Sequence, residues 1–269
     1  MRETLTSLQN PKIKQAVKLN ERRERNQTGL FIIEGYRELL RAADGHVVVK
    51  TLFICPEFFL GTNEEDLILR FGKTGADIVT CDPRVFEKLS YRDRPDGLIG
   101  VAVQMKRDLS YLKEKLLGKK DPFLVLAESI EKPGNLGTIL RSADAAGVDG
   151  VIVCDRCTDI YNPNVVRASV GTLFTVPVVE SSSADLIDWL RSEQIRMVAA
   201  TPAAEQEFTR VDMSGGIAIA VGTEQLGLSA FLMGTADVKV RIPMHGTADS
   251  LNVATATTLL LYEVVRQRS

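Results

Sequence analysis

Three blocks in the second half of the chain decide its fold: NLGTILR at residues 135–141, GTEQLG at 222–227, and IPM at 242–244 running on to SLNV at 250–253. In each block, polar residues interrupt or border an apolar run. A buried or half-buried polar group costs free energy unless it is paired. Several such interruptions within one domain therefore indicate a functional site rather than surface decoration.

In order and spacing, the blocks resemble the three motifs of the SpoU (TrmH-like) branch of the SPOUT RNA methyltransferases. The first motif is an Asn followed six residues later by an Arg, here Asn135 and Arg141. The second is a Gly-x-Glu-x-x-Gly turn after an apolar strand, here IAIAV at 217–221 and then 222–227. The third is an Ile-Pro-Met strand end followed by a Ser-Leu-Asn-Val helix start. The resemblance covers residues 122–269.

The resemblance implies an α/β fold whose parallel sheet carries a C-terminal trefoil knot, a feature that no periodicity reveals because true knots are nearly absent from proteins. It implies methyl transfer from S-adenosylmethionine to a ribose 2′-hydroxyl of a structured RNA, with ribosomal RNA favoured and transfer RNA as the alternative. Arg141 is expected at the attacking hydroxyl, either as the base or as a group that holds the phosphate. The implied catalytic residues are Arg141, Asn135, Glu224, Ser250 and Asn252, and the implied cofactor-binding residues are Gly222, Ile242, Leu251, Thr201 and Met244.

Each motif residue also has a simpler explanation. Asn135 follows Lys-Pro-Gly and could be a helix N-cap, and Ser250 could cap a last helix over residues 251–268. Glu224 could be a turn acid and Arg141 an exposed charge. Six residues span about 1.7 helical turns, so the Asn and the Arg of the first motif need not share a face. Together and in this order, the residues favour a site.

Length and composition restrict the class of protein less closely than the motifs do. A chain of 269 residues with 45% apolar content suits one large or two modest domains. No run approaches the roughly 18 apolar residues of a membrane span, and MRET at residues 1–4 lacks a signal-peptide core, so we expect a cytoplasmic protein.

Four cysteines do not indicate a disulfide framework. Cys154 and Cys157 form a C-x-x-C, but only His46 and His245 could complete a zinc site, so we expect no metal.

The chain divides near residues 105–121. We expect an RNA substrate-binding α/β domain over 1–105, a Lys-rich linker helix over 106–121 and the knotted methyltransferase domain over 122–269. In the first domain, apolar runs at 30–33, 47–49, 51–54, 76–79 and 98–103 alternate with expected helices at 11–23, 35–43, 63–72 and 83–90. In the last, strands are expected near 123–127, 151–154, 177–179, 195–200, 216–221 and 238–242, which predicts a parallel sheet covered on both faces.

A net charge of −2 argues against a uniformly basic coat, so RNA contacts must be local. Residues 1–25 carry seven Lys or Arg against three Glu, which favours phosphate contact if RNA is the substrate and is otherwise a solvated helix face. NPKIK at 10–14 and FIIEGYR at 31–37 resemble the module that precedes many SpoU-type domains, although Gly35 and Arg37 could equally be a turn glycine and a surface charge. The candidate RNA contacts are Lys12, Lys14, Lys18, Arg22 and Arg37.

The resemblance also implies a homodimer with the site near its interface. The last helix carries more apolar residues than one buried face requires: Leu259, Leu260, Leu261, Tyr262, Val264 and Val265. The alternative explanation for these residues is simple core packing.

Two rival functions remain. A non-catalytic RNA-binding or ribosome-assembly protein is disfavoured because all five polar motif positions are present. A Rossmann-type enzyme is disfavoured because no Gly-x-Gly-x-x-Gly follows any strand.

Overall fold

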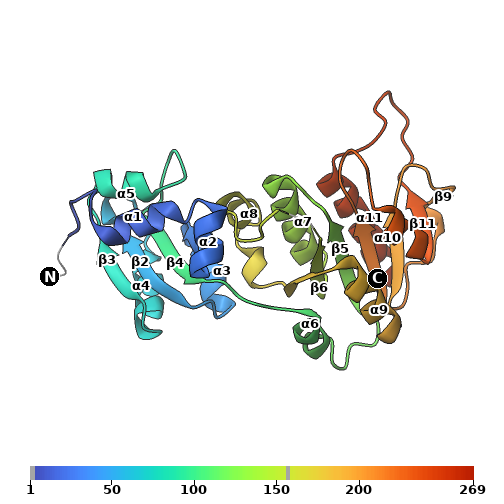
Figure 1. Cartoon of the computed structure of the whole chain (residues 1–269), viewed down its shortest axis with the longest axis horizontal. Coiled ribbons are helices and arrows are strands. Elements are labelled where there is room, and N and C mark those ends of the chain that lie inside the picture. The colour runs from blue at the N-terminus through green and yellow to red at the C-terminus, as the bar shows by residue number, and fades with distance from the viewer. Residues whose placement is uncertain (1–3, 156–157) are drawn as a thin grey trace. The chain divides into compact units, whose positions relative to one another are not determined.

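The computed structural model describes residues 4–155 and 158–269. They form two compact units, each built around its own sheet (Figure 1). The units comprise Met1–Met105 with Asp159–Thr175 (unit 1) and Lys106–Thr158 with Val176–Ser269 (unit 2). The inclusion of a segment from the second half of the chain in unit 1 has no counterpart among the sequence-based expectations.

Unit 1 is built on a four-stranded mixed sheet in the order β1-β4-β2-β3. Strand β4 runs antiparallel to β1 and β2, and β3 runs parallel to β2. The strands are β1 (Leu30–Glu34), β2 (Val49–Ile54), β3 (Asp77–Thr80) and β4 (Leu98–Val103). The helices are α1 (Pro11–Lys18), α2 (Arg22–Thr28), α3 (Tyr36–Asp44), α4 (Glu64–Lys73) and α5 (Pro83–Leu89), with a 3-10 turn η1 (Pro56–Phe58).

Two local expectations for unit 1 are wrong. The single helix expected over 11–23 is two helices, because the guanidinium of Arg25 donates to the carbonyl oxygens of Leu19 (2.8 Å) and Asn20 (2.9 Å) and so holds the connecting turn open. The apolar runs at 47–49 and 51–54 do not form two strands. Strand β2 begins at Val49 and continues to Ile54, and its register against β4 shifts just after its first residue.

Residues 159–175 are held in unit 1 by buried contacts. Arg25 is 1% exposed and forms an ion pair with Asp159 at 2.6 Å. The ring of Tyr161 packs on Phe31 with the centroids 4.6 Å apart, and its hydroxyl donates to the carbonyl of Met105. The segment also contains α8 (Pro163–Ala168), which packs on β1, and the 3-10 turn η2 (Thr172–Phe174).

Unit 2 contains a seven-stranded sheet in the order β7-β6-β5-β10-β8-β11-β9, and every neighbouring pair is parallel. The strands are β5 (Phe123–Glu128), β6 (Gly150–Cys154), β7 (Val178–Ser181), β8 (Arg196–Ala200), β9 (Gln206–Glu207), β10 (Ile217–Val221) and β11 (Val238–Arg241). The helices are α6 (Leu109–Lys115), α7 (Pro133–Ala145), α9 (Ser183–Ser192), α10 (Ala230–Thr235) and α11 (Val253–Arg268), with a 3-10 turn η3 (Phe208–Arg210).

Helices cover both faces of this sheet, as expected for a parallel sheet whose strands β5, β6 and β10 are buried along their whole length. Side chains of α6, α9 and α10 share one core with alternate strand residues such as Leu124, Met197 and Ala218. Helices α7 and α11 pack against each other and contact β6 and β10. The predicted fold class, an α/β chain with a small sheet unit before a parallel sheet, is confirmed. No helix in the described ranges is long and apolar enough to span a bilayer.

Two helix starts in unit 2 differ from the simpler explanations of the motif residues. Helix α7 begins at Pro133 after Lys132, so Asn135 lies inside the first turn and is not the N-cap. Helix α11 begins at Val253, and its N-cap is Asn252 rather than Ser250. The side chain of Asn252 accepts from the backbone N–H groups of the second and third helical residues, which is how an Asn cap satisfies otherwise unpaired donors.

Candidate active site

The loop that follows the central strand β10 is closed on itself. Thr223 and Gly227 exchange two backbone hydrogen bonds, of 2.9 and 3.0 Å. Gly227 has φ +69°, a left-handed conformation that favours glycine. A Cβ added to Gly222 would lie 2.1 Å from the carbonyl oxygen of Gly227 and 2.4 Å from the nitrogen of Leu228. The loop's own backbone therefore excludes any side chain at Gly222, a stronger reason than the ligand approach inferred from the sequence.

The far end of this loop is fixed by a residue that the motifs do not include. Glu128 ends β5, is 3% exposed, and accepts a 2.6 Å hydrogen bond from the backbone N–H of Ser229. Its other oxygen lies 3.4 Å from the hydroxyl of Ser183, which also hydrogen-bonds Asp155. Sequence reasoning missed Glu128, although a carboxylate that ends the apolar strand FLVLAE is itself an interruption of the kind that marks the motifs.

The three motifs meet at Glu224. Its Oε1 accepts from the side-chain amides of Asn135 at 2.8 Å and of Asn252 at 2.7 Å, and the Asn252 amide also donates to Oδ1 of Asn135 at 3.1 Å. Its Oε2 forms an ion pair with Lys132, a residue that the sequence analysis did not select. Glu224 is thus more than a turn acid, because it links the first turn of α7 to the N-cap of α11 through the β10 loop.

The electrostatics of this cluster favour the charged carboxylate. The hydrogen bond from Lys132, followed by that from Asn135, holds the pKa of Glu224 below its usual value. A carboxyl group with a lowered folded pKa contributes stability above its unfolded pKa and loses it as the pH falls through the folded value. Cross-linking by Glu224 therefore persists throughout the neutral range and is lost only under acid conditions.

One side of the β10 loop borders a hollow of about 370 Å³, within the usual size range of small-molecule sites. The ends of β8, β10 and β11 and the segment before α11 form its wall. Ser250 and the β10 loop itself contribute to the lining. So do all five expected cofactor-binding residues: Thr201, Gly222, Ile242, Met244 and Leu251. The other side of the loop borders a smaller hollow of about 100 Å³ lined by Lys132, Asn135 and Glu224.

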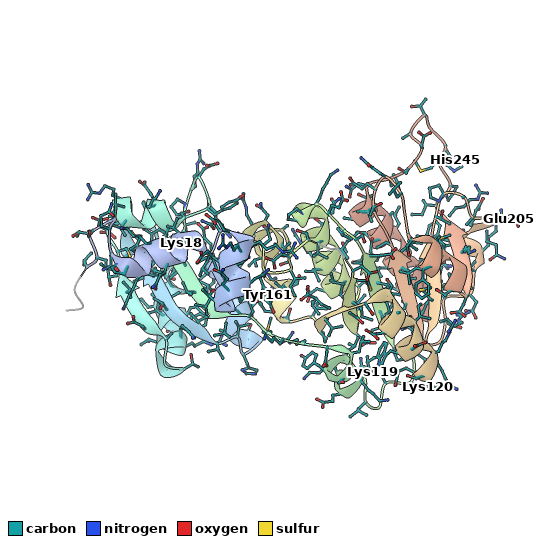
Figure 2. The ribbon with its side chains drawn as sticks, viewed as in Figure 1. Lys18, Lys119, Lys120, Tyr161, Glu205 and His245 are labelled. Atoms are coloured by element: carbon teal, nitrogen blue, oxygen red, sulfur yellow. The ribbon has the colours of Figure 1, made fainter. Side chains whose placement is uncertain are left out.

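The wall of the larger hollow offers backbone groups as well as apolar surface. In the described part of the chain, the backbone N–H groups of residues 244–251 make no hydrogen bond to another backbone group. Figure 2 shows His245 on this loop, which connects β11 to α11. Free backbone donors and acceptors around an apolar hollow suit a ligand with an aromatic base and several polar groups, so the residues present fit a nucleoside-type methyl donor.

Arg141 lies on α7, and its side chain is exposed. It forms no ion pair or hydrogen bond with any other described residue, whereas Asn135, six residues earlier on the same helix, is fully engaged with Glu224. The helix is anchored beside it by a 2.7 Å contact between the hydroxyls of Ser142 and Thr258 on α11. Arg141 is therefore an exposed cation on an anchored helix, without a hydrogen-bonding or ion-pair partner among the described residues.

The expected RNA contacts of unit 1 fall on different surfaces. Lys12, Lys14, Lys18 and Arg22 are exposed on α1 and α2, with Lys18 labelled in Figure 2, and Lys12 forms an ion pair of 2.6 Å with Asp77. Arg37 lies on α3 and lines a separate pocket from the one lined by Lys12 and Lys18. Arg25, counted in the basic stretch, is buried and paired, and Arg2 and Glu3 lie outside the described residues.

No group of three or more His, Cys, Asp or Glu side chains in the described ranges is arranged to hold a metal. Cys154 is buried in β6, and its C-x-x-C partner Cys157 lies outside the described residues. Burial raises the pKa of Cys55 and of Cys81 to about 12, which keeps both as inert thiols in the core of unit 1.

Comparison with known proteins agrees with this geometry. Residues 122–262 match the model of the SpoU rRNA Methylase family, and residues 10–100 match the MRM3-like substrate binding domain. The chain belongs to the SpoU rRNA methylase family. The resemblance inferred from the three motifs is thereby confirmed, and the family implies the trefoil knot in unit 2.

Similar proteins cover nearly the whole chain. The 23S rRNA (guanosine(2553)-2′-O)-methyltransferase RlmP of Bacillus subtilis is 28% identical over 97% of this chain and 98% of its own length. The 23S rRNA (uridine(2479)-2′-O)-methyltransferase of Streptomyces viridochromogenes is 32% identical over 93% of this chain and 87% of its own. The crystal structure of the AdoMet-bound rRNA methyltransferase from Sinorhizobium meliloti superposes with a TM-score of 0.88 at 31% identity, covering 98% and 97% of the two chains.

Proposed function

We propose that this protein transfers a methyl group from S-adenosylmethionine (AdoMet) to a ribose 2′-hydroxyl of 23S ribosomal RNA. The observation that carries the proposal is the meeting of all three SpoU motifs at Glu224, beside a hollow lined by all five expected donor-binding residues. The two relatives described above are named as 23S rRNA 2′-O-methyltransferases and match along nearly their whole length. We include a cytoplasmic location in this proposal, because ribosomal RNA is the proposed substrate.

The donor would lie in the larger hollow against Thr201, Ile242 and Leu251, with the β10 loop closing over it. AdoMet, when bound, supplies a methyl group on an electrophilic sulfonium. The ribose hydroxyl is a poor nucleophile until its proton leaves, so positioning and proton removal carry most of the catalysis. The small hollow lined by Lys132, Asn135 and Glu224 shares the β10 loop with the donor hollow, which favours it as the side from which the acceptor approaches.

Arg141 is the residue we assign to the RNA. A guanidinium normally stays protonated, so its direct role is to hold the phosphate of the target nucleotide through charge-assisted hydrogen bonds. The proton that leaves the hydroxyl would then pass to that phosphate. Asn135, Glu224 and Asn252 act on the loop and not on the reacting atoms, because each is engaged by the others. Ser250 lines the larger hollow, where its hydroxyl would contact the donor.

Removing the Glu224 carboxylate should separate positioning from binding. Glu224→Ala leaves two side-chain amides and Lys132 without their acceptor, and we expect the methyl-transfer rate to fall on the order of 100-fold because the loop loses its fixed geometry. Glu224→Gln keeps an acceptor for the amides and removes the ion pair, so its rate should fall less. Glu205→Ala, an exposed carboxylate of unit 2 labelled in Figure 2, is the matched control. Equal rates for Glu224→Ala and the control would remove Glu224 from the site.

The basic surface of α1 is proposed to capture RNA before the chemistry. If Lys12, Lys14 and Lys18 bind phosphates, changing them to Gln should make the slope of log affinity against log salt shallower by roughly 0.7 to 0.9 for every phosphate that is no longer neutralised. AdoMet affinity should not change, because these side chains belong to the other unit. An unaltered slope in filter binding with 23S rRNA fragments would make this surface a solvated helix face.

A homodimer is also part of the proposal. Leu260, Leu261 and Val264 of α11 are fully buried, so these three residues pack in the core of their own unit. Leu259 and Tyr262 of the same helix are 41% and 48% exposed and give α11 an apolar face directed away from the core of its own unit. Such a face on the helix that carries the Asn252 cap would bring a second copy close to the site. Sedimentation of the purified chain tests the oligomeric state.

The alternative of a non-catalytic RNA-binding protein is less favoured. The hydrogen-bond cluster around Glu224 is intact, and we explain this cluster by the need to hold the β10 loop in a fixed position. The direct cellular test is to map 2′-O-methylated positions in total RNA with and without the gene. The proposal expects loss of methylation at one or a few 23S positions. Loss at a transfer RNA position alone would move the substrate to that class, and no loss at all would contradict the enzymatic function.

A further inference from the structure

Unit 1 contains an open pocket of about 820 Å³ where α3 begins, beside the loop 90–97 that precedes β4. All of its lining residues belong to unit 1. The wall is rich in charged side chains of both signs: Arg37, Arg92, Arg94 and Arg167 with Glu38, Glu64, Asp93 and Asp96. Nothing in the proposed methyl transfer uses this pocket.

Most of the acidic groups are already engaged by the protein. Arg92 donates to Glu38 at 2.6 Å and lies 3.6 Å from Asp96. Oε1 of Glu64 accepts from the backbone N–H groups of residues 60 and 61 at 3.1 and 2.8 Å. The charges of Glu38 and Asp96 therefore offset that of Arg92, and the charge of Glu64 is stabilised by backbone N–H groups, so these carboxylates do not attract a cation.

Three arginines of the wall remain free. Arg37, Arg94 and Arg167 are exposed, and in the described ranges none of them forms an ion pair or a side-chain hydrogen bond. Asp93 is the one acidic side chain of the wall that is likewise without a described partner. Three unpaired guanidiniums against one carboxylate make the mouth of the pocket attractive to an anion with more than one negative charge.

The frame that carries these arginines is fixed by buried polar contacts. Arg92 donates to the backbone carbonyl of Glu34 at 2.8 Å, and the carboxylate of Glu34 accepts from the backbone N–H of Tyr91 at 2.8 Å. Asp96 accepts from the backbone N–H of Tyr36 at 2.9 Å. The loop 90–97 is thereby tied to the end of β1 and the start of α3, so that little ordering remains to be done when a ligand binds.

The inner wall holds an excess of unsatisfied polar atoms. Four buried side-chain nitrogen or oxygen atoms in the described residues have no hydrogen-bond partner, and three of them belong to this wall: Oε2 of Glu64, Nε of Arg92 and Oδ1 of Asp96. Native proteins rarely leave such atoms unpaired, and each one calls for an explanation. Two acceptors and one donor suit a ligand that offers both hydrogen-bond donors and acceptors, which the phosphodiester of an RNA backbone does not.

We propose that this pocket binds an unpaired nucleotide of the substrate RNA, with its phosphates held by Arg37, Arg94 and Arg167 and its base directed to the inner wall. The inference rests on the proposed function in taking RNA as the substrate. A base in single-stranded RNA exposes its amino and ring-nitrogen groups, whereas pairing in a helix covers them. Arginine planes and the ring of Tyr36 at the wall offer stacking surfaces for it.

Short RNA tests the pocket with the full chain. The probes are a labelled hexacytidine and a labelled hexamer of the same length with abasic riboses, which has the same phosphates and no bases. The variant is Arg37→Gln with Arg94→Gln and Arg167→Gln, all exposed positions that should not disturb folding. Hexacytidine affinity should fall at least about tenfold in the variant, and its salt slope should become shallower by roughly 0.7 for each phosphate that the arginines no longer hold. The abasic probe should bind wild type more weakly than hexacytidine does.

A control of equal charge replaces Lys73, Arg84 and Lys88, exposed on α4 and α5, with Gln and should retain the wild-type slope. The inference is overturned if the pocket variant and this control lose affinity equally, or if the two probes bind alike. Failure of the proposed function looks different. Wild type would then leave 23S rRNA unmethylated while hexacytidine binding still depended on the three arginines.

Discussion

Arg141→Ala is expected to abolish methyl transfer to RNA while leaving AdoMet affinity within a few fold of wild type. The guanidinium is exposed on α7 and forms no hydrogen bond or ion pair with another described residue, so its removal should not disturb the fold. A group that positions the nucleophile or serves its proton transfer is worth on the order of 100- to 10,000-fold in rate. Single-turnover transfer measures the first quantity and calorimetric titration with AdoMet measures the second.

Arg191→Ala supplies the matched control, because this residue is also an exposed helical arginine of unit 2. Its transfer rate should remain near that of wild type. Near-normal turnover in Arg141→Ala would contradict the assignment. A joint loss of transfer and of AdoMet affinity would also contradict it, because it would place the arginine at the donor rather than at the RNA.

Gly222→Ala is expected to weaken AdoMet binding severely, by at least about tenfold, through damage to the loop. The added Cβ would lie 2.1 Å from the carbonyl oxygen of Gly227, a backbone atom that cannot move aside as a flexible side chain could. Relieving such overlap in a packed region costs about 1–3 kcal/mol and must displace the segment that borders the donor hollow. Calorimetry with AdoMet, together with thermal unfolding of the same sample, checks this result.

Gly234→Ala is the matched control, since a Cβ there would meet no atom within 4 Å and the residue lies in helix α10. This control should bind AdoMet as wild type does. RNA capture by unit 1 should survive in both variants. If Gly222→Ala keeps full AdoMet affinity and the same unfolding temperature as wild type, the closure of the β10 loop is not what shapes the donor site.

The motif blocks are sufficient to predict which segments meet at the candidate site, because each block has a particular side chain at a strand end or a helix start, where backbone geometry is set locally. The order of the blocks predicts that Asn135, Glu224 and Asn252 belong together, and their hydrogen bonds join them in the structure. For Gly222 the structure adds a reason for glycine beside the ligand approach that the sequence predicts. The obstacle to a side chain there is Gly227, a contact that only the folded loop creates.

Other features depend on distant pairings that no local pattern contains. Lys132 escapes selection because a lysine before a helix is ordinary until Glu224 is seen beside it. Arg25 belongs to a basic stretch in the sequence, whereas its partner Asp159 lies more than a hundred residues away along the chain. The same pairing explains why residues 159–175 join unit 1 although the strands on either side belong to unit 2. Burial of a charge depends on its partner, so such residues look exposed in a sequence.

The most direct test of the central claim is transfer of labelled methyl from AdoMet to unmodified 23S rRNA by the purified chain, followed by complete alkaline hydrolysis. A ribose 2′-O-methyl group blocks cleavage of the adjacent phosphodiester, because that cleavage needs the free hydroxyl. The account predicts that the label appears in alkali-resistant dinucleotides with wild type and is absent with Arg141→Ala. Label released in mononucleotides would show base methylation instead, and no incorporation by wild type on 23S rRNA would contradict the proposed substrate.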